Sequence, residues 1–116
     1  MAYEEELAER VGELVEGEPG LSEKRMFGGL AFLIEGNMAV AVSGKGGLMV
    51  RVDPEETGVL LAEPYAGPFE MNGREVRGWL RVDAAGLTSA EKLRRWVQLG
   101  VEFARTLPPS LSAETG

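Results

Sequence analysis

The stretch Arg25–Val40, RMFGGLAFLIEGNMAV, decides the fold of this chain, because it is the most hydrophobic segment and a turn divides it. If the chain is extended here, Leu30, Phe32 and Ile34 point to one side, and small or apolar residues point to the other. Such a pattern is typical of a central strand that is covered on at least one side. The segment 35–37, Glu-Gly-Asn, favours a hairpin turn because Gly and Asn tolerate positive φ angles. The stretch therefore predicts two neighbouring strands at the centre of the core.

A third strand follows a glycine-rich loop, Gly44-Lys45-Gly46-Gly47. This loop invites comparison with a phosphate-binding loop, which needs Ser or Thr after the lysine and then a helix. Here a glycine follows the lysine, and residues 48–52 have the apolar alternation of a strand. We therefore interpret the loop as a second hairpin connection.

Two helices are predicted in the first two thirds of the chain. Residues 3–16 carry apolar side chains at helical spacing with glutamates on the opposite side, and Pro and Gly at 17–20 end this pattern. Asp53-Pro54-Glu55-Glu56 combines an N-cap residue, a first-turn proline and acids, which together favour a helix start. We expect that short helix to end before Pro64, because the residue before a proline disfavours helical geometry.

The last helix has the clearest start signal, since Thr88-Ser89-Ala90-Glu91 reads as a capping box. Pro108-Pro109 ends it. The predicted buried stripe is Leu93, Trp96, Val97, Val101 and Ala104. Gly100 lies in this stripe, and a glycine there costs about 1 kcal/mol relative to alanine. We therefore expect close contact between helix and sheet at Gly100.

Two more strands, 69–71 and 74–82, are predicted around the turn dipeptide Asn72-Gly73. The order of elements is then α-β3-α-β2-α. Successive strands with short connections are antiparallel, so we predict an α+β fold of two layers, with a five-stranded, mainly antiparallel sheet and helices mainly on one face. We assign residues 1–107 to this one domain and expect a disordered tail at 108–116.

Composition excludes several classes of function. The chain has 116 residues and a net charge of −7, and an acidic surface repels phosphate backbones. It has no Cys and no His, so disulfides, Cys-ligated metals and Ser-His-Asp or Cys-His hydrolases are excluded. We expect no catalytic residue, no metal and no cofactor. No apolar run approaches the roughly 20 residues that span a bilayer, and no signal peptide is recognisable, so we expect a cytoplasmic protein.

The last strand holds the most suggestive side chains. Alternation places Arg77, Trp79 and Arg81 on one side of it, and Arg51 lies on the polar side of its own strand. Arginine and tryptophan on an open sheet face could stack bases and hold phosphates, or could anchor a protein partner or second subunit. A solvated face on which arginine stems cover the tryptophan would have no function. Arg25 is a further candidate, because the core leaves its charge unexplained.

The chain resembles the N-terminal domain of the TfoX/Sxy family, regulators associated with natural competence in bacteria. The likeness is carried by Arg25-Met26-Phe27-Gly28-Gly29 and the hairpin after it, by Leu48–Asp53, by Pro68-Phe69 to Met71, by Gly78-Trp79 and by the helix around Trp96-Val97 to Ala104, and it covers roughly residues 5–107. It implies an α-β3-α-β2-α fold similar to that of type III secretion chaperones, and regulation through protein contacts without catalytic residues. Full-length TfoX-like regulators carry a second domain, and this sequence ends at Gly116, so we expect a single-domain relative.

Our leading expectation is a non-enzymatic regulatory domain that forms a homodimer and binds an unidentified protein partner through the sheet face or a sheet edge. The first alternative is a transcription-linked module that touches nucleic acid through Arg51, Arg77, Trp79 and Arg81. The second alternative is a small-molecule-binding domain, which would need an apolar pocket with convergent polar groups.

Overall fold

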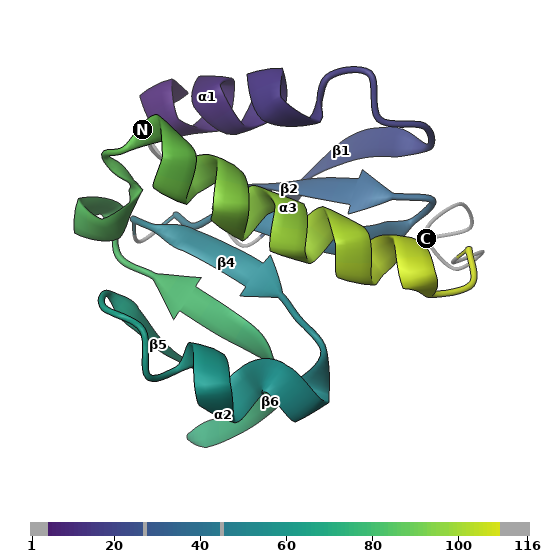
Figure 1. Ribbon diagram of the computed structural model, residues 1–116. Coiled ribbons are helices and arrows are strands. Elements are labelled where there is room, and N and C mark those ends of the chain that lie inside the picture. The colour runs from purple at the N-terminus through teal and green to yellow at the C-terminus, as the bar shows by residue number, and fades with distance from the viewer. Residues whose placement is uncertain (1–4, 27, 45, 110–116) are drawn as a thin grey trace.

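The computed structural model describes residues 5–26, 28–44 and 46–109 of the chain. Its elements, in chain order, are α1 (Glu5–Val15), β1 (Leu21–Met26), β2 (Gly29–Ile34), β3 (Asn37–Val42), β4 (Leu48–Arg51), η1 (Pro54–Glu56), α2 (Thr57–Leu60), β5 (Ala66–Met71), β6 (Arg74–Val82), η2 (Ala84–Leu87) and α3 (Ala90–Thr106) (Figure 1). Phe27, Lys45 and residues 3, 4 and 110–116, which the sequence analysis assigned, lie outside the described residues.

All strands belong to one antiparallel sheet in the order β1-β2-β3-β4-β6-β5. The predicted α+β class is confirmed, but the described sheet has six strands, so the prediction of five was wrong. The missed strand is β1, which pairs with β2 along its whole length. Its central residues, Ser22 to Arg25, are polar and exposed. An edge strand has a neighbour on one side only, so it needs no apolar alternation and its sequence resembles a loop.

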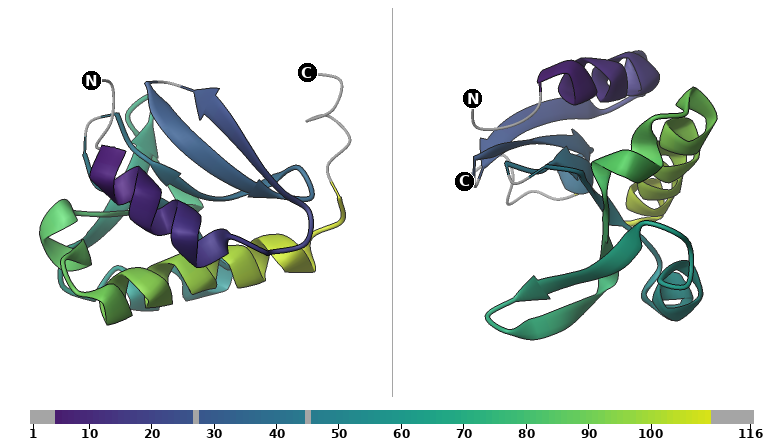
Figure 2. Two further views of the ribbon diagram at one scale, coloured as in Figure 1. Left: turned by 90° about the horizontal axis from the view of Figure 1, so that it is seen from above. Right: turned by 90° about the vertical axis from the view of Figure 1, so that its left-hand side faces the viewer.

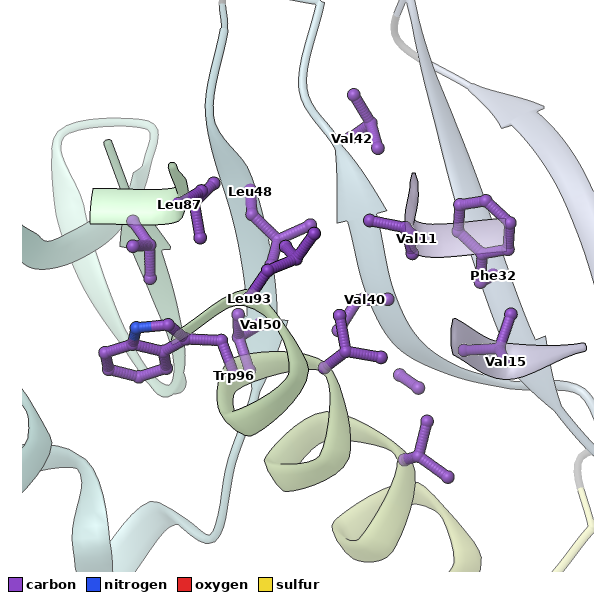
Figure 3. Packing of buried hydrophobic residues seen from close by; sticks show 14 of the residues in the cluster. Val11, Val15, Phe32, Val40, Val42, Leu48, Val50, Leu87, Leu93 and Trp96 are labelled. Atoms are coloured by element: carbon purple, nitrogen blue, oxygen red, sulfur yellow. The ribbon is translucent and has the colours of Figure 1, made fainter. Parts of the chain in front are cut away.

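The helices and the sheet form two layers, with α1 and α3 against the same face of the sheet (Figure 2). Figure 3 shows Val11 and Val15 of α1 and Leu93 and Trp96 of α3 pointing toward the strands, where Phe32 belongs to the same buried cluster. The predicted stripe of α3 is buried at all of its positions. A second, smaller cluster consists of strand residues only, namely Ala31, Leu33 and Ala41 with Met38 and Met49 packed against them.

Two glycines in this core are required by close backbone approach. A Cβ on Gly100 would clash with the carbonyl oxygen of Ala39, which confirms the expected contact between α3 and the sheet. A Cβ on Gly29 would clash with the carbonyl oxygen of Val42, so the entry to β2 also needs a glycine. Larger residues would push α3 or β2 away from β3, and overpacking of this kind usually destabilises a core.

The predicted turns and caps are largely confirmed. Ile34 pairs with Asn37, so the first hairpin turn consists of Glu35 and Gly36, both with positive φ, and Asn37 already belongs to β3. Helix α3 begins one residue later than the capping box suggested. Its N-cap is Ser89, whose side-chain oxygen accepts a hydrogen bond of 3.4 Å from the backbone N–H of Lys92.

Candidate protein-interaction surfaces

The structure brings together two of the predicted site residues, Arg51 and Trp79. They lie opposite each other in the β4–β6 pair, and the guanidinium carbon of Arg51 is 5.2 Å from the centroid of the Trp79 ring. The same carbon is 5.9 Å from the ring centroid of Phe103, which belongs to α3. Burial lowers the pKa of the Arg51 guanidinium below its ordinary value. Arg51 therefore links the sheet to a helix, and its cation is already held by two aromatic rings.

Arg77 lies in a different environment, next to a kink in β6. Gly78 has a φ of 90°, and its N–H donates a hydrogen bond of 2.9 Å to the side-chain oxygen of Thr57. Thr57 in turn donates to the carbonyl oxygen of Asp53 at 3.3 Å. The exposed Arg77 donates from Nη2 to the carbonyl oxygen of Pro54 at 3.1 Å. The start of η1 and α2 thus fixes the kink and orients Arg77.

Beyond the kink, the β5–β6 hairpin continues past the end of β4. We call this part, residues 69–77, the arm; β4 pairs only with the later residues 79–82 of β6. Figure 2 (right) shows the arm projecting from the body of the molecule. The rings of Phe69 and Trp79 lie 6.3 Å apart at its base.

A shallow cavity of about 170 Å³ separates the arm from α2. Its lining consists of Thr57, Gly58, Leu61, Pro68, Glu75, Val76, Arg77 and Trp79. Nearby on α2, the side chain of Val59 is 75% exposed, the most exposed large apolar residue described. The cavity combines apolar walls with one arginine and one glutamate, and exposed apolar surface rimmed by polar groups is typical of protein contact sites.

Arg81 lies two residues from Trp79 along β6. It lies opposite Met49 of β4 on one side and Gly67 of β5 on the other. Directly opposed residues share a face of the sheet, so Arg81 lies on the face of the smaller cluster, to which Met49 belongs.

Arg25 is exposed and lies on β1, at the opposite end of the sheet from β6 and β5. The predicted residues therefore form no single site. Arg51 and Trp79 are in contact, Arg81 lies two residues farther along β6 on the same face, Arg77 borders the adjacent cavity, and Arg25 lies at the far edge of the sheet.

A second groove, about 280 Å³ in volume, runs between α1 and α3, and the sequence analysis did not predict it. Leu14, Val97 and Val101 line it together with the polar Glu18, Arg94, Gln98, Glu102 and Arg105. Arg105 forms an ion pair with Glu18 across one end. Phe103 was missed as well, although its spacing of seven residues from Trp96 would have placed it on the same side of the helix.

Two kinds of feature are absent from the described part of the chain. No helix there is long and apolar enough to cross a bilayer. No group of three or more carboxylate side chains there is placed to hold a metal ion.

The fold defines a small, two-layer α+β domain. A family model described as the TfoX N-terminal domain matches residues 13–104, and the chain belongs to this family. At the family level the chain is therefore a regulatory domain. No curated protein matched it.

Proposed function

We propose that this chain is a non-enzymatic regulatory domain that acts in the cytoplasm by binding other protein chains, and that it forms a homodimer. A separate partner binds at the arm and the cavity beside α2. The observation that carries the proposal is the cavity itself, which Arg77, Trp79 and Val76 line in a member of a regulatory family.

The geometry of the arm supports a protein partner at this place. Tryptophan and arginine are enriched among the residues that dominate protein interfaces. Trp79 is half-buried against Phe69 and Arg51, so its orientation is fixed before a partner arrives. Pre-organised side chains lose less conformational entropy on binding.

The nucleic-acid alternative receives less support from the same geometry. Arg51 and Phe69 already lie against the Trp79 ring, although base stacking needs a free aromatic face. Arg51 is also held against Phe103 instead of being free to meet a phosphate. The small-molecule alternative is weakened by cavity size, since pockets for such ligands usually hold about 300–1,000 Å³.

The experiment is affinity capture from the native host with the wild-type chain and Arg77→Glu, followed by identification of the bound proteins. Arg77 is exposed, so the reversal should leave the fold intact. We expect one or more partners to be retained by wild type and lost with Arg77→Glu. Val76→Ser should weaken the same partners, because it removes an apolar side chain that lines the cavity.

Arg94→Glu is the matched control, since it makes the same charge change at an exposed position of α3 outside the arm. It should retain the partners. Partners that are lost with Arg94→Glu but retained by Arg77→Glu would contradict the arm as the binding surface and point to the α1–α3 groove.

A further inference from the structure

Within the described residues, one side of the β1 backbone has no strand partner. The hydrogen bond of 2.8 Å from the N–H of Glu35 to the carbonyl of Gly20 marks a hydrogen-bonded pair just before the strand. Such pairs alternate with non-hydrogen-bonded pairs along an antiparallel ladder. In the observed register, Ser22 and Lys24 therefore bond to β2, whereas Leu21, Glu23 and Arg25 direct their N–H and C=O groups outward.

One outward group is already used, and its direction supports the alternation. The N–H of Leu21 donates to the carbonyl of Glu18 at 3.3 Å, away from β2. The outward groups of Glu23 and Arg25 remain as a short template for another strand. In Figure 2 (left), which looks onto this edge from above, α1 lies beside β1 and not across it.

The other edge of the sheet is interrupted by a proline. Asp83 N–H bonds to the carbonyl of Tyr65 at 2.9 Å, and in the observed register Gly67 is also directed inward, to Arg81. Pro68 is therefore an outward position, and proline has no N–H to offer there. An added strand would be interrupted at Pro68 of β5, whereas Leu21–Met26 of β1 contains no proline.

A second copy of the chain meets a strict geometric condition if it pairs with β1. A two-fold axis perpendicular to the sheet keeps each residue on its own face, and opposed residues must also share a face. The axis must therefore lie midway between one residue and the same residue of the second copy. That residue is the centre of the pairing. Two centres give a useful overlap, Glu23 and Lys24.

Charge distinguishes these centres. With the axis at Glu23, each glutamate opposes its own copy, and like charges directly opposite each other are destabilising. With the axis at Lys24, Glu23 opposes Arg25 of the second copy, and this pair occurs twice. Both residues direct their backbone outward, so the same pairs also form the hydrogen bonds between the strands. Lys24 then faces its own copy on the other side of the sheet, which weakens the assembly without removing it.

We propose that two copies of this chain associate through antiparallel pairing of their β1 strands, centred on Lys24, to form one continuous sheet. Glu23 and Arg25 are the side chains that determine the register. Both are exposed, and they lie on the helix-covered face because they oppose Phe32 and Leu30 of β2. This inference rests on the homodimer of the proposed function and specifies its interface, and it is independent of the partner at the arm.

The test is a charge swap, with the dissociation constant of the dimer measured by analytical ultracentrifugation. Glu23→Arg and Arg25→Glu each place like charges opposite each other twice, and we expect each to weaken the dimer roughly 30-fold. The double variant E23R/R25E restores opposite charges, so its dissociation constant should return to within about threefold of wild type. Circular dichroism and urea unfolding report whether each variant is folded, and Arg94→Glu is the matched control for charge.

Recovery of the dissociation constant of the dimer in the double variant supports the proposal. If folded single variants dimerise like wild type, or if the double variant stays as weak as the singles, the β1 interface is overturned while the homodimer itself stands. A wild-type chain that stays monomeric at every concentration overturns both the interface and the homodimer. If Glu23→Gln strengthens the dimer and Arg25→Glu has no effect, the axis passes through Glu23 and the proposed register is wrong.

Discussion

The two edges of the sheet resist unwanted strand pairing by different means. At β5, Pro68 occupies an outward position and removes the N–H that a neighbouring strand would need. At β1 the outward N–H groups remain, and the strand instead carries the sequence Ser22-Glu23-Lys24-Arg25. A proline interrupts pairing with any strand, whereas charges prevent pairing only with strands that do not match them. The difference indicates that strand pairing is interrupted at β5 and selective at β1.

Both edge strands are also held in place through α3. The connection before β5 is tied to the helix by the Arg95–Glu63 ion pair, and the connection before β1 by Arg105–Glu18. The edges are thus fixed by similar contacts and differ in their own backbones. The comparison is tested by substitutions in β1 that introduce a proline, as in β5, or that remove one of its charges.

The largest effect is expected from a proline on the inward side of β1. Lys24→Pro removes an N–H that bonds to β2 and leaves the carbonyl of Ala31 without its donor, so we expect a loss of about 3 kcal/mol in the free energy of unfolding. Arg25→Pro removes an outward N–H and should cost about 1 kcal/mol or less. Urea unfolding of the two variants at low protein concentration checks this. Equal losses would contradict the assigned directions of the β1 backbone.

Arg25→Pro places a proline at an outward position of β1, as Pro68 does in β5. Two hydrogen bonds would be missing from the symmetric pair, one from each copy, which corresponds to about 2 kcal/mol, or roughly a 30-fold weaker dimer. Sedimentation equilibrium measures this change. If Arg25→Pro remains folded and dimerises as tightly as wild type, the interface lies elsewhere.

Lys24→Thr should have the opposite and smaller effect. It removes the like charges at the centre of the β1 pair and introduces a residue favoured in strands, so the dimer should tighten by about 1 kcal/mol, or about fivefold. Lys92→Thr is a suitable control, because Lys92 is exposed on α3. A dimer weakened by Lys24→Thr would mean that Lys24 meets an acidic partner and not its own copy.

The smallest effect concerns the ion pair before β5. Hydrogen bonding from Arg95 holds the pKa of Glu63 below its ordinary value. Its contribution is therefore complete above the ordinary glutamate pKa and is lost as the pH falls through the lower folded-state pKa. Glu63→Gln should cost about 0.5 kcal/mol at neutral pH, because exposed pairs contribute little, and less in acid. Thermal unfolding at several pH values measures the difference; a loss that grows in acid would have the wrong sign.

Much of the fold could be predicted from local signals. The Glu35-Gly36 turn, the stripe of α3 and the close approach at Gly100 each depend on a few neighbouring residues, and each was confirmed. Strand β1 was missed because Ser22 to Arg25 lack apolar alternation and pair with a strand whose own pattern already accounts for the core.

The candidate surfaces were less predictable because they depend on contacts between distant segments. The sequence indicated Arg51 and Trp79, but the approach of Phe103 depends on where α3 crosses the sheet. The kink at Gly78, which separates Arg77 from Arg81, depends on Thr57 and the position of α2. The charge of Arg25 had no explanation until its backbone could be assigned to the outward side of an edge strand.

Amide hydrogen exchange of β1, followed by NMR at increasing protein concentration, tests the central claim most directly. Lys24 N–H should be protected at every concentration, because it bonds to β2 within one chain. The N–H groups of Glu23 and Arg25 should exchange fast when dilute and slow as the dimer forms. If the mass doubles while these two amides continue to exchange fast, the claim that β1 is the selective edge of the sheet is contradicted.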